Sequence, residues 1–388
     1  MEISACVKYV GVNDHQVDLF EGQYKVPNGM SYNSYMILDD KIAVMDTVDG
    51  FFTEEWLNNV EQVLDGKMPD YLIIQHMEPD HSASIPAFLK KYPKATVIST
   101  AKGFQFMEQF FQEFFAGQGL PAEQRIVAAN DGVLELGQHS LHFVYAPMVH
   151  WPEVMMTYEA TEKILFAADG FGKFGALDVE EEWTDEARRY YIGIVGKYGP
   201  QVQAVLKKAA GLDIQTICSL HGPVLKENLG FYLEKYDKWS SYQPEESGVV
   251  IAYASVYGNT RNAAEYLADV LQEKGQKTVL YDLARCDKAK AVADAFRYDR
   301  LVLAGITYNG DLFPCMRSFI EGLTERNYQN RKVAIIENGT WAPMAGKLIL
   351  GMFEKSKNLT FTETTVSIKS AMNEKNKEEI GKLAQELS

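Results

Sequence analysis

The stretch HMEPDH, residues 76–81, decides the fold of the first half of this chain and directly follows the apolar run YLIIQ, residues 71–75. The run is short and contains β-branched residues, which predicts a buried strand. Proline lacks an N–H and keeps the residue before it out of helical angles, so we expect the six residues to form a loop. Beyond the loop the sequence predicts a helix, with Ser82 or Ser84 as N-cap and Pro86 in the first turn.

Four side chains of this loop can bind a metal ion, namely His76, Glu78, Asp80 and His81. Their spacing differs from the His-Glu-x-x-His zinc motif, whose histidines lie one turn apart on a helix. The alternative interpretation is that two surface histidines lie beside acidic residues that cap the helix. Chance rarely places four such groups within six residues behind a buried strand, so we favour a metal site.

Three further stretches place a histidine or an aspartate beyond the C-terminal end of a predicted strand. They are His150 in PMVHWPE (147–153), Asp169 after the strand 163–168, and His221 after the strand 214–220. Taken alone, an aspartate followed by glycines is typical of a turn. The recurrence of the placement favours a shared site, because strand ends can converge on one rim of a sheet.

The four histidines and three carboxylates suffice for two metal ions with one bridging carboxylate. Nitrogen and oxygen ligands without a thiolate favour iron, manganese or zinc over copper(I). The remaining histidines, His15, His139 and His142, lack the strand-end placement, and we expect them to be structural or surface residues.

Length, composition and charge limit the possible functions. The 388 residues suffice for two or three domains, and 46% of them are hydrophobic, as in ordinary soluble proteins. No apolar run approaches membrane-spanning length and no secretory signal is evident, so we expect a cytoplasmic protein without a membrane partner. The formal net charge of −15 argues against nucleic acid or an anionic membrane as a partner.

The four cysteines are scattered along the chain, at Cys6, Cys218, Cys286 and Cys315. None forms a Cys-x-x-Cys pair, so we expect neither a rubredoxin or zinc ribbon within the chain nor a disulfide framework. The cysteines are expected to be isolated buried thiols.

A polar connector at residues 240–248 separates a first domain, residues 1–245, from a second, residues 249–388, in which strands and helices alternate. Strands are predicted at about 249–254, 277–281, 300–305, 332–336 and 361–367. Amphipathic helices are predicted at about 260–273, 287–297, 314–325, 342–355 and 373–386. Five β/α units of this size predict a doubly wound parallel sheet.

Three turns of the second domain lie at predicted strand ends. They are Ser255-Val256-Tyr257-Gly258-Asn259-Thr260, Thr307-Tyr308-Asn309-Gly310-Asp311 and Asn338-Gly339-Thr340-Trp341-Ala342. The first leads into a helix whose N–H groups and dipole favour a phosphate, although a tight turn without a ligand is the alternative. Ligands of parallel sheets bind at such strand ends, and Tyr308 and Trp341 offer flat faces to an aromatic ring. Neither a P-loop nor a Gly-x-Gly-x-x-Gly motif is present, which argues against a nucleoside triphosphate or a Rossmann dinucleotide.

The metal-binding motifs together resemble the metallo-β-lactamase-like domain of flavodiiron proteins (A-type flavoproteins). The resemblance implies an α/β fold that begins with an αββα sandwich. It also implies that His76, Glu78 and His150 hold one iron, that Asp80, His81 and His221 hold the other, and that Asp169 bridges them. Hydrolases of that superfamily typically carry a second histidine where this chain has Glu78, whose negative charge suits a centre that visits a higher oxidation state.

The first turn of the second domain resembles the FMN phosphate loop of flavodoxins, and the other two turns fit the same family. The resemblance implies a flavodoxin-like doubly wound five-stranded sheet that binds FMN. The implied FMN contacts are Ser255, Val256, Tyr257, Gly258, Asn259, Thr260, Thr307, Tyr308, Asn309, Gly310, Asn338, Gly339, Thr340 and Trp341. The third turn departs from the Gly-Ser-Tyr-Gly-Trp form common in flavodiiron proteins.

The resemblance covers nearly the whole chain, domain order included. It implies an oxidoreductase that reduces O2 to water, NO to N2O, or both, at a diiron centre supplied with electrons through FMN. Because the chain contains no rubredoxin ligands, a separate electron donor such as rubredoxin is expected. Members of the family dimerise head to tail, which implies a homodimer or a dimer of dimers.

Two other functions stay open on the sequence. One is a dizinc hydrolase fused to a flavodoxin domain, with a metal-bound hydroxide as nucleophile. The other is a flavin electron carrier whose metal site is vestigial, although the presence of all seven metal-binding residues argues against it. Zinc without iron would support the hydrolase, and a flavin without gas turnover would support the carrier.

Overall fold

The computed structural model describes residues 3–388, which form two compact units. The first unit contains the chain up to Tyr191 together with Pro200–Glu234. The second contains Ile192–Gly199 and Lys235–Ser388. The domain limits predicted from the sequence, 1–245 and 249–388, remain a prediction.

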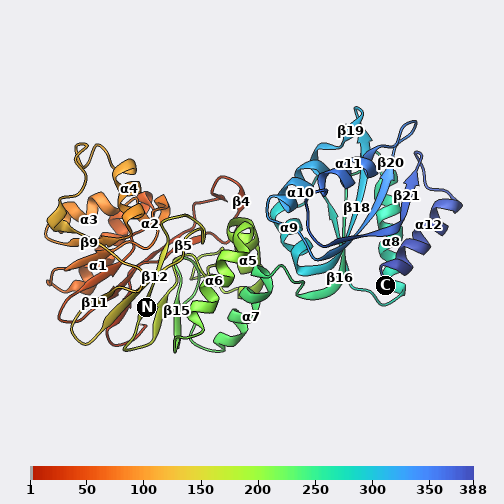
Figure 1. Cartoon of the computed structure of the whole chain (residues 1–388). Helices are drawn as coiled ribbons and strands as arrows, with labels where there is room; N and C mark the ends of the chain where they lie inside the picture. Colours follow the sequence, from red (N-terminus) through yellow and green to blue (C-terminus); the bar gives the residue numbers. More distant parts are fainter. Residues whose placement is uncertain (1–2) are drawn as a thin grey trace. The chain divides into compact units, whose positions relative to one another are not determined.

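The first unit is built on two sheets (Figure 1). One has the order β1 (Val7–Tyr9), β6 (Tyr35–Ile37), β7 (Ala43–Met45), β8 (Tyr71–Ile73), β9 (Thr96–Ser99), β10 (Arg125–Val127). The other has the order β11 (Val133–Glu135), β12 (Ser140–Tyr145), β13 (Met155–Glu159), β14 (Ile164–Phe166), β15 (Thr216–Cys218). Two short ribbons pair β2 (Val12–Asp14) with β5 (Met30–Tyr32) and β3 (Leu19–Phe20) with β4 (Tyr24–Lys25).

Apolar side chains from the facing sides of the two sheets form one core. It includes Tyr35, Met45 and Ile73 from the first sheet and Phe143 and Phe166 from the second. Helices lie outside the sheets (Figure 1), at α1 (Thr53–Leu64), α3 (Ile85–Lys91), α4 (Ala101–Phe110), α5 (Trp183–Tyr190) and α6 (Gly199–Ala209). A further helix, α7 (Leu229–Ser240), contributes residues to both units. The predicted αββα sandwich is therefore confirmed, because each sheet buries one face against the other and is covered by helices on its outer face.

The loop predicted at residues 76–81 is only partly a loop. Glu78 has extended backbone angles, as predicted for a residue before proline, but Asp80 and His81 lie in the short helix α2 (Pro79–Ser82). The prediction of a loop throughout was wrong because Pro79 occupies the first helical turn, where its missing N–H costs no hydrogen bond. Ser84 is the N-cap of α3, although its side chain accepts no capping hydrogen bond.

The second unit is a parallel sheet in the order β17 (Thr278–Asp282), β16 (Glu246–Tyr253), β18 (Tyr298–Tyr308), β20 (Arg331–Asn338), β21 (Leu359–Ile368). A short strand, β19 (Asp311–Leu312), pairs antiparallel with the end of β18. The helices are α8 (Asn259–Glu273), α9 (Lys288–Arg297), α10 (Pro314–Thr324), α11 (Ala345–Met352) and α12 (Glu374–Glu386). The predicted doubly wound five-stranded parallel sheet is confirmed, and its first strand lies between the second and the third.

The predicted polar connector at residues 240–248 is partly buried. The side chain of Tyr242 is 6% exposed, and its hydroxyl donates to the carbonyl of Gly196 at 3.0 Å. The backbone carbonyl of Tyr242 accepts a hydrogen bond from the buried guanidinium of Arg331 at 2.7 Å. The sequence predicted a polar connector here, and the one aromatic ring of this segment anchors it within the second unit.

Candidate functional site

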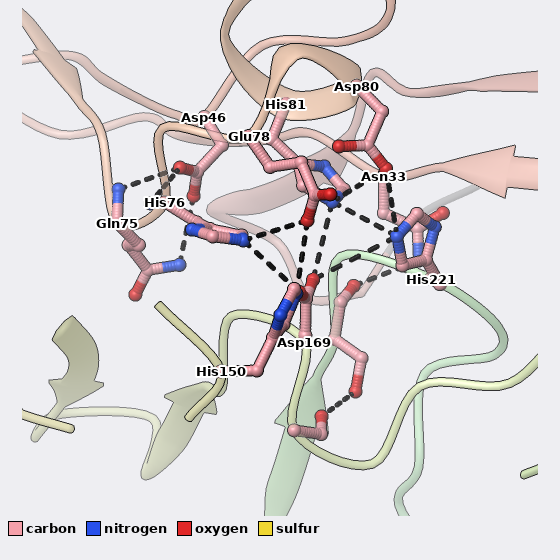
Figure 2. A network of polar contacts seen from close by, with 12 residues as sticks. Asn33, Asp46, Gln75, His76, Glu78, Asp80, His81, His150, Asp169 and His221 are labelled. Carbon is pink, nitrogen blue, oxygen red and sulfur yellow. Dashed lines mark hydrogen bonds and ion pairs between the residues drawn. The ribbon is translucent and has the colours of Figure 1, made fainter. Parts of the chain in front are cut away.

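The seven predicted metal-binding side chains converge on one rim of the first unit (Figure 2). They form two groups, each with ligand atoms within 4.8 Å of one another: His76, Glu78, His150 and Asp169 in one, and Asp80, His81 and His221 in the other. The register of the second sheet explains part of this convergence. Phe166 of β14 lies opposite Cys218 of the parallel strand β15, and Asp169 and His221 each follow three residues later.

Asp169 connects the two groups, with one carboxylate oxygen facing each. Its Oδ2 lies 3.4 Å from Nε2 of His76 and 3.2 Å from Nε2 of His150. Its Oδ1 lies 3.3 Å from Nε2 of His81 and 3.9 Å from Nε2 of His221. Figure 2 shows Asp169 between the four imidazoles, which is the position of a carboxylate that can bridge two metal ions.

Each group has one further carboxylate. Oε2 of Glu78 lies 3.2 Å from Nε2 of His76 and 3.0 Å from Nε2 of His150. Oδ2 of Asp80 lies 3.3 Å from Nε2 of both His81 and His221. Each half of the site therefore offers two imidazole nitrogens, its own carboxylate and one oxygen of Asp169.

Several polar atoms of the site are buried without a hydrogen-bond partner among the described residues. They are both carboxylate oxygens of Asp80 and Oδ1 of Asp169, whose charged neighbours are imidazole nitrogens at 3.3 Å or beyond. Burying polar atoms without partners is costly. In addition, Nε2 of His81 and Nε2 of His221 face each other at 3.0 Å, an arrangement in which both lone pairs can point at one ion. The chemistry of the donors and these atoms together fit a pair of metal ions.

The electrostatics of the site favour added positive charge. Burial alone would lower the pKa of His76, but Asp169, Glu153 and Glu78 hold it well above its usual value. Burial would likewise lower the pKa of His150, which the contacts with Asp169 and Glu78 raise to about 9. Burial would raise the pKa of Asp169, but the imidazoles of His76, His150 and His81 hold it well below its usual value. Two metal cations would supply the positive charge that this cluster stabilises.

Two of the histidines are oriented by a partner on their other ring nitrogen. Nδ1 of His76 lies 2.8 Å from Oε1 of the buried Glu153, which also accepts the backbone N–H of Met77 at 2.9 Å. Nδ1 of His221 lies 2.7 Å from the carbonyl oxygen of Ser31. Such partners hold the proton on Nδ1 and direct the lone pair of Nε2 towards a metal. Glu153 and Ser31 were not among the predicted site residues, although Glu153 ends the predicted block 147–153.

Asp46, which the sequence analysis did not identify, holds the backbone at the start of the metal-binding loop. Its Oδ1 accepts the N–H of Gln75 at 2.7 Å, and its Oδ2 accepts from Nε2 of Gln75 at 2.9 Å. The N–H of His76 lies 3.4 Å from the same Oδ1. Burial raises the pKa of Asp46 to about 6. The hydrogen bonds to Gln75 are therefore made by a carboxylate that loses hydration on folding. No local pattern marks this residue, because its partners come from a different strand.

The second unit contains a cavity of about 410 Å³ at the carboxyl ends of β16, β18 and β20. All of the residues predicted to contact FMN line it except Gly258. Ile306, Ala342, Met344 and Ser370 also line it and were not among those predicted. The side chain of Trp341 is 89% exposed and that of Tyr308 is 48% exposed, so both flat rings are available at the mouth.

The turn before α8 has the geometry of a phosphate loop. Gly258 is the N-cap of this fifteen-residue helix and has a φ of 91°, a conformation that side chains other than glycine rarely adopt. Its N–H donates to Oγ of Ser255 at 3.1 Å, which closes the turn. The N-terminus of α8 thus opens onto the cavity, where its N–H groups and dipole can bind an anion.

Comparisons with known proteins identify a family for both parts of the chain. A family model described as ODP family beta lactamase matches residues 30–222, and a flavodoxin domain model matches residues 250–378. The chain belongs to the flavodiiron protein family. This flavodiiron protein is 28% identical to a nitric oxide reductase of Moorella thermoacetica. The match covers 88% of this chain and 86% of the relative.

Solved structures show the same fold. The flavodiiron protein of Giardia intestinalis superimposes with a TM-score of 0.91 and 25% identity, covering 100% of this chain and 96% of that one. The rubredoxin oxygen:oxidoreductase of Desulfovibrio gigas gives a TM-score of 0.92 at 24% identity, covering 100% and 97%. This flavodiiron protein is therefore an oxidoreductase whose cofactors are FMN and a diiron centre. Within residues 3–388, no helix has the length and apolar character needed to span a membrane.

Replacing Gly258 by alanine is expected to weaken FMN binding about tenfold. An added Cβ would meet no atom within 4 Å, so the effect would come from the positive φ, which costs an alanine about 1–2 kcal/mol. Relief of that strain would turn the N–H groups away from the phosphate. Flavin fluorescence titration of the apoprotein measures the change.

The matched control is Gly275→Ala. Gly275 also has a positive φ (74°) and open space around it, and it lies just beyond the C-terminal end of α8. It should lower the thermal stability of the second unit to a similar extent and leave the affinity for FMN unchanged. Equal losses of FMN affinity in the two variants would contradict the role assigned to the turn.

Proposed function

We propose that this flavodiiron protein reduces O2 to water, NO to N2O, or both. In this proposal His76, Glu78 and His150 hold one iron, Asp80, His81 and His221 hold the other, and Asp169 bridges them. The observation that carries the assignment is the orientation of Asp169, whose two oxygens each face the two imidazoles of a different group. The name of the Moorella relative, nitric oxide reductase, supports the choice of substrate.

The chain's own residues prepare this site in two ways. Glu153 and the carbonyl of Ser31 fix the orientation of two imidazoles before any metal binds. Glu78, Asp80 and Asp169 bring three negative charges to a buried site, which favours ferric over ferrous iron and so suits a redox cycle. When bound, two irons supply a place where a small diatomic molecule can accept electrons between two cations that share its developing negative charge.

The second unit supplies the electrons in this proposal. Its three turns would hold FMN, with the phosphate at the N-terminus of α8 and the ring beside Tyr308 and Trp341. We also infer a separate electron donor such as rubredoxin, and a head-to-tail homodimer or dimer of dimers in the cytoplasm. The resemblance to the family supports the donor and the assembly.

Elemental analysis and flavin absorbance of protein purified without added metal test the proposal first. The ligand set predicts about two irons and one FMN per chain. Consumption of O2 and of NO, measured separately with reduced rubredoxin as donor, then identifies the substrate. Stoichiometric zinc with little iron from iron-replete cells would contradict the oxidoreductase proposal and favour a dizinc hydrolase. One FMN without turnover of either gas would favour an electron carrier.

A further inference from the structure

A second group of metal-binding side chains lies at the opposite end of the first unit's strands. It consists of Cys6, His139 and Glu162, whose ligand atoms lie within 4.8 Å of one another. His139 directly precedes β12 and Glu162 lies two residues before β14, whereas Asp169 lies beyond the other end of β14. The group is therefore separate from the diiron site by the length of a strand.

The imidazole of His139 is buried and oriented by an aspartate. Its Nδ1 lies 2.7 Å from Oδ2 of Asp39, and both side chains are only 5% exposed. The same oxygen accepts the backbone N–H groups of Gln138 and His139, and Oδ1 accepts that of Asp40. Because Asp39 already accepts three backbone N–H groups, its carboxylate acts as an acceptor towards the imidazole as well. Nδ1 of His139 then carries the proton, and its Nε2 faces Glu162, with Oε1 at 3.3 Å.

The surrounding backbone holds the other members in place. The carbonyl of Cys6 accepts the N–H of Leu38, which places the thiol beside the turn that carries Asp39. The carboxylate of the buried Glu159 accepts the N–H of Glu162 at 2.6 Å and so fixes the turn between β13 and β14. An added Cβ on Gly137 would lie 2.7 Å from Oδ1 of Asp39, so only glycine leaves room for this carboxylate.

We propose that Cys6, His139 and Glu162 form a mononuclear site for a divalent transition metal, with Zn²⁺ as the expected occupant. One thiolate, one imidazole and one carboxylate are a set that borderline-soft zinc accepts, and three protein ligands leave a fourth tetrahedral position for water. The aspartate–histidine pair has the arrangement that orients metal-binding histidines in proteins. On binding, the thiol of Cys6 loses its proton to solvent and the sulfur bonds to the metal. The half-buried Cys6 and Glu162 leave the site open to solvent.

The metal-free interpretation is an ion triad in which a protonated His139 joins Asp39 and Glu162. Burial would lower the pKa of His139, but the two carboxylates raise it above its usual value, which is consistent with such a triad. The thiol of Cys6 takes no part in such a triad, however, whereas it is a ligand in the proposed zinc site. Sulfur coordination therefore distinguishes the two, and it does so independently of the proposed gas reduction.

Zinc K-edge X-ray absorption of the iron-loaded, FMN-loaded protein after equilibration with Zn²⁺ tests the proposal. We expect one bound zinc per chain with one sulfur neighbour at about 2.3 Å. The diiron site contains no sulfur ligand, so zinc that replaced iron there would show only nitrogen and oxygen neighbours. Iron content measured before and after equilibration reports such replacement directly.

Three variants complete the test. Cys6→Ser should remove the sulfur signal, and Glu162→Gln should weaken zinc binding at least about tenfold in a competition with a chromophoric chelator while the sulfur signal persists. Cys286→Ser is the matched control, because it removes another half-buried thiol and should change neither measurement. Absence of a zinc–sulfur distance in the parent protein, or its persistence in Cys6→Ser, would overturn the proposal.

Discussion

Replacing Asp169 by asparagine is expected to reduce the iron content to one ion or less per chain and the rate of gas reduction about a hundredfold or more. Asparagine keeps the shape of the side chain but offers one oxygen instead of two, and its NH2 group cannot bind a cation. One half of the site then loses its shared ligand, and the charge that balances four buried imidazoles is lost as well. Elemental analysis and assays with O2 and NO measure the two effects.

Asp70→Asn provides a control for this substitution. Asp70 lies just before β8, at the end opposite His76, and its carboxylate accepts from Lys41 and from the N–H of Ile42. This variant should keep its iron and its activity, and both variants should keep one FMN per chain. Full iron occupancy and unchanged turnover in Asp169→Asn would show that the two oxygens do not bridge a metal pair.

Replacing Asp46 by alanine is expected to lower the free energy of unfolding of the first unit by about 3 kcal/mol. The substitution leaves the N–H and the side-chain amide of Gln75 without their acceptor, at about 1–3 kcal/mol for each buried donor. It also places alanine at a φ of 55°, which costs about 1–2 kcal/mol. Removal of a carboxylate whose burial raises its pKa to about 6 offsets part of this loss. Differential scanning calorimetry of the full chain resolves the transition of this unit.

Asp46→Asn separates shape from charge at the same position. Asparagine tolerates the left-handed conformation, and its carbonyl oxygen can still accept from the N–H of Gln75. We therefore expect the asparagine variant to melt close to the parent protein. If it were as unstable as the alanine variant, the negative charge rather than the backbone contacts would be responsible.

The sequence was informative about the metal site because each metal-binding residue follows a strand or a proline-bounded turn. These local signals depend on the residue types and their order, which tertiary contacts do not alter. The FMN turns were predictable for the same reason, since parallel strands place their ligands at their carboxyl ends. The structure brings the seven predicted metal-binding side chains together in two adjoining groups, and all of the predicted FMN contacts except Gly258 line one cavity.

The helix that contains Asp80 and His81 was harder to predict than the residues themselves. A proline both ends and begins helices, and only the surrounding packing decided that Pro79 begins one. The thiols show the same limit. Cys218 is buried as expected, but Cys6, Cys286 and Cys315 are half-buried, because exposure depends on what the folded chain places over each side chain.

The sequence by itself determined the order of the two domains and predicted the seven metal-binding residues and the three FMN turns, because each is encoded within a few neighbouring residues. Only the tertiary structure decided which oxygen of Asp169 faces which pair of imidazoles, that Glu153 and Asp46 support His76, and that Cys6 meets His139. The physical reason is that these contacts join residues from different strands of the fold. Their distances depend on sheet register and core packing, which no local pattern contains.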